Sequence, residues 1–169
     1  MQGADMKKTT LIVVAVVVFA VPVIAVIVER QEKNDMYLAL QGAGRITGLT
    51  LDRMDAIASE GAKIAGISKS AGREVAIQLA RTGKIGGEMF LPIIGSVGKY
   101  ARLTGKDIKA AGADLAEAFA DPVYGAVKLN SKVGFLDART QTLIRNMSAS
   151  GNDTDAQRAL FEKYNNSLP

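Results

Sequence analysis

The residue types that most often carry out chemistry in proteins are missing from this chain. Its 169 residues include no His, Cys or Trp. Without Cys there is no thiolate nucleophile, thiolate metal site or disulfide. Without His, the usual proton carrier near neutral pH and the commonest metal ligand are absent. These absences exclude Ser-His-Asp and Cys-His triads and zinc sites built on His pairs, whereas a carboxylate or lysine mechanism remains possible.

Two glycine patterns approach nucleotide-binding motifs without meeting their spacing. The segment from Gly42 through Gly44 to Gly48 resembles a dinucleotide fingerprint, but its third glycine is one residue too late and no strand precedes it. Three Gly-Lys pairs resemble the end of a P-loop, but none has a glycine five residues earlier. These pairs lie at 83–84, 98–99 and 105–106.

Acidic side chains offer the remaining chemistry. Asp52 with Asp55, and Glu117 with Asp121, are spaced to share one face of a helix. Paired acids at this spacing are typical of solvated helix surfaces, and nothing around them marks a substrate pocket. We therefore expect no enzyme, no cofactor, no metal site and no small-molecule ligand.

The charge balance bears on the partners. The formal net charge is +4, and after residue 28 there are 19 Lys and Arg against 16 Asp and Glu (21 − 2 and 17 − 1). A nucleic-acid-binding domain needs clustered positive charge. We therefore do not expect nucleic acid as a partner.

One segment is almost wholly apolar. Leu11 to Val28 reads LIVVAVVVFAVPVIAVIV, with no charged or hydrogen-bonding side chain. As a helix it is about 27 Å long, close to the roughly 30 Å hydrocarbon thickness of a bilayer. We predict a transmembrane anchor over residues 9–28, kinked at its proline. Its marker residues are Leu11, Phe19, Pro22 and Val28.

A cleaved signal peptide is the alternative. Lys7 and Lys8 suit its charged region and Ala25 a cleavage site, but the apolar run is longer than the usual 7 to 15 residues and continues past Ala25. We therefore expect the segment to be retained. A short basic tail before a long apolar run favours an N-terminus in the cytoplasm and a domain outside it, which in a bacterium is the periplasm.

The chain is predicted to be all-α: one transmembrane helix followed by a small helical domain rich in Gly and Ala. The predicted boundaries are a basic tail at 1–8, the anchor at 9–28, a charged collar at 29–35 and the helical domain at 36–169. Apolar residues recur at helical spacing within the domain, and no strand pattern is evident. The helical stretches expected are 36–81, 90–103, 106–120, 135–147 and 154–164.

Two local features refine this prediction. Asp121-Pro122 is predicted to end a helix, and Thr154 with Gln157 fits a capping box. Glycines are frequent between residues 42 and 72, and a glycine-rich helix is stable only where close packing offsets its low propensity. Gly44 and Gly48, four residues apart, are the candidate helix-packing glycines.

FLPIIGSVGK, from Phe90 to Lys99, resembles short amphibian membrane-active peptides of the temporin type. The resemblance covers ten residues and implies that this stretch lies at a membrane surface. The alternative is an ordinary core helix. As a helix, the stretch places its larger apolar residues on one face. These are Phe90, Ile93, Ile94 and Val97.

These features favour a membrane-anchored structural or assembly subunit of a larger complex, either an envelope machine or a phage virion. The expected partners are a lipid bilayer and other protein subunits. The alternative is a membrane-remodelling or pore-forming protein for delivery or lysis. An enzyme based on carboxylates or lysine is a third and weaker hypothesis.

Overall fold

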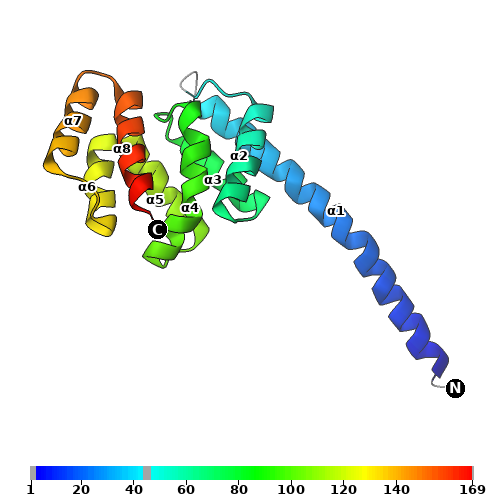
Figure 1. The fold of residues 1–169 in the computed structure, drawn as a ribbon. Helices are drawn as coiled ribbons and strands as arrows, with labels where there is room; N and C mark the ends of the chain where they lie inside the picture. The colour runs from blue at the N-terminus through cyan, green and yellow to red at the C-terminus, as the bar shows by residue number, and fades with distance from the viewer. Residues whose placement is uncertain (1–2, 44–46, 169) are drawn as a thin grey trace. The chain divides into compact units, whose positions relative to one another are not determined.

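The structure is a computed structural model that describes residues 3–43 and 47–168, with side chains from residue 21 onward. Throughout these residues it is helical, without strands, in agreement with the predicted all-α class (Figure 1). The helices are α1 (Gly3–Ala43), α2 (Leu51–Ala65), α3 (Lys69–Arg81), the 3₁₀ turn η1 (Gly87–Met89), α4 (Phe90–Thr104), α5 (Ile108–Ala120), α6 (Pro122–Val133), α7 (Ala138–Ala149) and α8 (Asp153–Ser167).

The chain divides into two compact units, Met1–Asn34 and Asp35–Pro169. The first consists of the N-terminal part of α1, and this helix continues through Pro22. From residue 21 onward, where side chains are described, no helix has a stretch that is both long and apolar enough to cross a membrane. Of the predicted anchor residues, Leu11 and Phe19 have side chains outside the described part, whereas Val28 is exposed.

After the end of α1, the second unit continues with two helical hairpins of the same plan, α2–α3 and α4–α5. The first helices, α2 and α4, each have 15 residues, and the second helices, α3 and α5, each have 13. Each hairpin turns through a glycine at φ +67°, Gly66 or Gly105, a conformation that glycine adopts without steric cost. Two residues later, Ser68 or Asp107 caps the second helix by accepting a backbone N–H. In the stack, α2 packs on α4 and α3 packs on α5.

The remaining helices complete the unit. α6 packs on α5, and α6, α7 and α8 contact one another. Asp121 ends α5, as predicted from the Asp-Pro pair, but it also starts α6: its Oδ1 accepts the N–H of Tyr124 at 3.0 Å, and Pro122 occupies the first turn. The sequence reading missed α6 because it treated the proline only as a terminator, whereas proline is also favoured at the first helical position.

Two further predictions need correction. The stretch 36–81 is not one helical region, because α1 ends at Ala43 and two separate helices follow it. The capping box is also wrong. Asn152 precedes α8 without a side-chain cap, and Gln157 is 1% exposed and donates through Nε2 to the Lys84 carbonyl at 2.9 Å. Gln157 therefore ties α8 to the loop before η1.

Candidate assembly surfaces

The stretch with the temporin-like pattern forms the centre of the helical unit. It forms α4, and the four apolar residues singled out from the sequence each have no exposed surface. They are Phe90, Ile93, Ile94 and Val97. In this fold none of the four is available to a membrane surface, and the core-helix alternative describes their position.

Backbone glycines allow the neighbouring helices to approach α4 and α5 closely. A Cβ atom on Gly98 would lie 2.2 Å from the carbonyl oxygen of Ala65, and one on Gly125 would lie 1.9 Å from that of Ala118. Both distances are far shorter than any ordinary contact, so these two positions require glycine. At these two points α2 meets α4, and α5 meets α6, backbone to backbone without an intervening side chain.

The glycines that pack are not the pair predicted from the sequence. Gly44 lies outside the described residues. Gly48 follows α1 in a turn at φ +60°, and a Cβ built on it would meet nothing within 4 Å. Its role is to supply a left-handed backbone conformation, so the helix-packing role predicted for Gly48 is wrong.

A buried ion pair joins α2 to α3. Arg73 Nε donates to Asp55 Oδ1 at 2.6 Å, and Arg73 Nη2 donates to Asp55 Oδ2 at 3.2 Å. The Arg73 side chain is 4% exposed and that of Asp55 is 21% exposed. A two-point guanidinium–carboxylate contact fixes orientation as well as distance. This pair therefore sets how the first hairpin closes.

A second polar cluster joins α4, α5 and α6. Asp114 accepts hydrogen bonds from Tyr100, at 3.2 Å, and from Lys106, and Lys128 Nζ lies 3.4 Å from its other oxygen. Burial alone would raise the pKa of Asp114, but the Lys106 hydrogen bond and the two lysine charges outweigh it, so this pKa is below its usual range. Burial also raises the pKa of Tyr100 to about 12. The tyrosine therefore stays neutral and serves as a donor.

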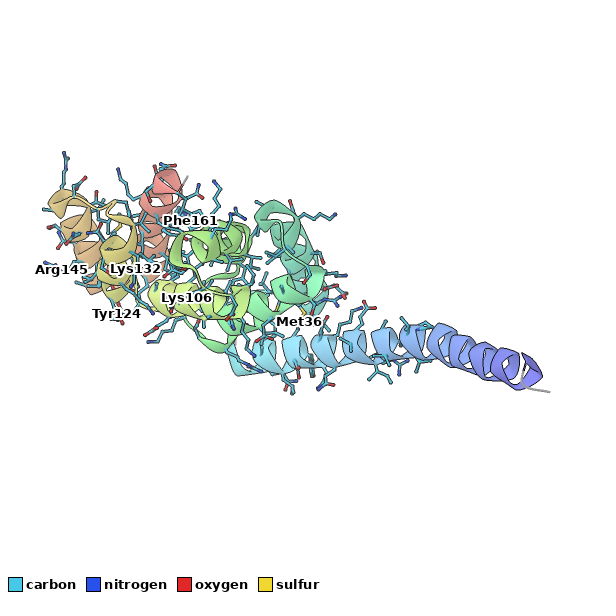
Figure 2. The ribbon with its side chains drawn as sticks, turned by 90° about the horizontal axis from the view of Figure 1, so that it is seen from below. Met36, Lys106, Tyr124, Lys132, Arg145 and Phe161 are labelled. Atoms are coloured by element: carbon cyan, nitrogen blue, oxygen red, sulfur yellow. The ribbon has the colours of Figure 1, made fainter. Side chains whose placement is uncertain are left out.

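Helices α4, α5 and α8 meet at an aromatic cluster centred on Tyr164 of α8. Its ring lies 6.2 Å from that of Tyr100 and about 6 Å from those of Phe119, Phe135 and Phe161 (Phe161 is labelled in Figure 2). These contacts are edge-on or steeply inclined, the arrangements that aromatic rings prefer. Burial raises the pKa of Tyr164 above its usual range. The cluster is a structural core and presents no reactive group to solvent.

The described surface has several shallow hollows. One apolar hollow of about 360 Å³ lies beside α4, lined by Ile64, Leu91, Gly95 and Phe161 among others. A more polar one of about 450 Å³ includes Asp121. Within residues 21–43 and 47–168, whose side chains the structure describes, no three acidic side chains gather to hold a metal ion.

Most of the exposed large hydrophobic residues in the described part of the chain lie on α1, eight of thirteen. Val21, Ile24 and Ile27 are 61%, 58% and 57% exposed, and Leu38 is 54% exposed in the second unit. The sequence reading marked the apolar segment but not Leu38, which lies beyond the charged collar. Exposed apolar surface of this extent is typical of an interaction site.

The structure is all-helical throughout the residues that it describes. A family model described as the prophage tail length tape measure protein matches residues 3–145. This range covers most of the 169 residues, so the chain belongs to that family. It is a structural phage tail protein rather than an enzyme, and its partners are other protein subunits of the tail. No curated protein and no solved structure matches it.

Proposed function

We propose that this chain is a tail subunit whose N-terminal helix enters a lipid bilayer. Residues 9–28 are the membrane span, and residues 36–169 form a helical domain that packs against other tail subunits. In a bacterial host the N-terminus lies in the cytoplasm and the domain in the periplasm. The observation that carries the proposal is a 41-residue helix, about 60 Å long, with 18 consecutive apolar residues near its start.

Physical chemistry supports a bilayer as the environment of this segment. A helix satisfies its own backbone hydrogen bonds, as a lipid-exposed segment must. The valines and isoleucines from residue 21 to 28 are about half exposed or more, so they need an apolar environment outside the chain. The family is described as a tail length tape measure protein. An α-helix suits the setting of a length, because each residue adds a fixed rise of about 1.5 Å. On this proposal α1 contributes length in the tail and reaches lipid outside it.

The test is flotation of the full-length protein with liposomes after carbonate extraction. Val18→Lys together with Phe19→Lys puts two charges at the middle of the proposed span, at a cost of about 5–7 kcal/mol. We expect the wild type to float and this double variant to remain at the bottom. The matched control is Val127→Lys with Leu143→Lys, which alters two exposed apolar residues of the bundle and should float normally. Equal flotation of both double variants would refute the membrane span.

Orientation is tested with single cysteines, because the chain has none of its own. In intact cells, a membrane-impermeant maleimide should label Ser150→Cys, in an exposed turn, and should label Gln2→Cys only after lysis. The reverse pattern would place the domain in the cytoplasm.

Vesicle leakage separates this role from the alternative of delivery or lysis. The apolar residues of α4 are buried, so the folded protein should float without releasing a trapped dye. Dye release by the wild type that is lost in Val97→Asp would favour the pore-forming alternative.

A further inference from the structure

We infer that the apolar hollow beside α4 is a docking groove for one helix of another tail subunit, and that this helix has an apolar face and an acidic first turn. The hollow has a volume of about 360 Å³, and residues of α2, α4 and α8 line it. Binding of an amphipathic helix in an apolar groove is a common mode of recognition. The inference rests on the tail family and not on the membrane span.

The groove has a floor and two walls. Leu91, Gly95 and Lys99 follow one another at intervals of four residues along α4, so they lie on one face of that helix. α4 lies between α2, which contributes Ile64, and α8, which contributes Phe161 (Figure 1). The floor is low because Gly95 has no side chain. A row of side chains from a partner can therefore enter between the walls.

A protein helix fits this groove better than a flat lipid surface does. Ile64 is 64% exposed, whereas Leu91 and Phe161 are only partly exposed. A flat surface that touched Ile64 would leave the deeper side chains uncovered. Apolar side chains three and four positions apart on a helix project far enough to reach them. The shape therefore favours a helix of a protein subunit as the occupant.

The two ends of the groove have opposite charges. Lys99 and Arg102, near the C-terminal end of α4, are exposed and take part in none of the ion pairs found among the described residues. Glu88, in η1 just before α4, is exposed at the opposite end. Helices favour acidic residues in the first turn and basic residues in the last. Such a helix matches both ends of the groove when it runs antiparallel to α4.

Photocrosslinking in cells that assemble the tail tests the groove. With p-benzoylphenylalanine in place of Leu91, irradiation should give one main adduct with another tail subunit. Mass spectrometry should place the crosslink in a segment that has apolar residues three and four apart after an acidic turn. The control carries the same group in place of Tyr124, which is 49% exposed on α6, and should not give this adduct. An adduct with lipid, with a second copy of this chain or with any other segment, or no adduct, would overturn the inference.

A charge exchange tests the acidic turn. Lys99→Glu should lower the yield of the adduct at position 91 about fivefold, because it replaces an attraction between exposed charges with a repulsion. Changing the acidic residues of the crosslinked segment to Lys should then restore the yield. The control is Lys132→Glu, which makes the same change at an exposed position on α6 and should leave the yield unchanged. No restoration would refute the charge match.

The groove and the membrane span fail in different measurements. Lys99 is exposed, so Lys99→Glu should keep the circular dichroism spectrum of the wild type and should float with liposomes as the wild type does. A failed groove gives no adduct while flotation is normal. A failed membrane span gives no flotation while the adduct forms normally.

Discussion

The glycine at position 98 provides the sharpest test of how the bundle is held together. Gly98→Ala adds one methyl group where the Ala65 carbonyl oxygen lies 2.2 Å away. An ordinary carbon–oxygen contact is longer by about 1 Å, so α2 and α4 must separate. The clash involves backbone on both sides, and no side-chain rotation can relieve it.

Two opposing effects set how much Gly98→Ala changes the free energy of unfolding. Forcing an extra methyl group into a well-packed core costs about 1–3 kcal/mol, and more where the backbone must move. The change from glycine to alanine inside a helix returns up to about 1 kcal/mol. We expect a net loss of about 2 kcal/mol in the free energy of unfolding. This loss corresponds to a fall in Tm of about 6–10 °C for a domain of this size.

Gly95→Ala is the matched control, because it makes the same change on the same helix. A Cβ atom there would lie 3.1 Å from Cγ2 of Ile64, a side chain that is 64% exposed and free to turn aside. We expect no loss of stability at this position and a small gain from helix propensity. The assay is urea unfolding of the full-length protein in mild detergent, with the helix content monitored by circular dichroism at 222 nm. If the two variants unfold at the same urea concentration, the close approach at Gly98 does not control stability.

Two further predictions concern the polar contacts between helices. Asp55→Ala should lower the free energy of unfolding by about 3 kcal/mol, because it removes the carboxylate that pairs with the buried Arg73 guanidinium. In the same urea assay, Asp55→Ala with Arg73→Met should recover part of this loss. No recovery would contradict this account. The pKa of Asp114 is lower in the folded protein than its usual value of 3.8, so its contribution to stability is complete above about pH 4 and is lost as the pH falls through the folded value. The wild type should therefore lose more stability than Asp114→Asn between pH 5 and about pH 3, and parallel pH profiles would show that the lysine contacts have no net effect.

The fold class was predictable because helical periodicity is a local property. Apolar residues three and four positions apart defined the stretches that became α4, α5 and α7, within a few residues at each end. The stretch that became α8 was predicted from the capping box at Thr154 instead. The missed helix α6 and the mistaken capping box at Thr154 share one cause. Short motifs such as Asp-Pro or Thr-x-x-Gln describe several local structures, and tertiary contacts select among them, as the burial of Gln157 shows.

The sequence by itself determined what this protein lacks and where its apolar residues are concentrated. The absence of His and Cys removed most catalytic chemistry, and the run from Leu11 to Val28 is unmistakable in any fold. Tertiary structure alone decided which glycines pack and which apolar face is buried. Gly98 and Gly48 look alike in the sequence, but only the placement of a neighbouring backbone gives one a packing role and the other a turn. The face of α4 from Phe90 to Val97 would suit lipid or a protein core equally well. α4 packs against α2 and α5, so that face lies in the core.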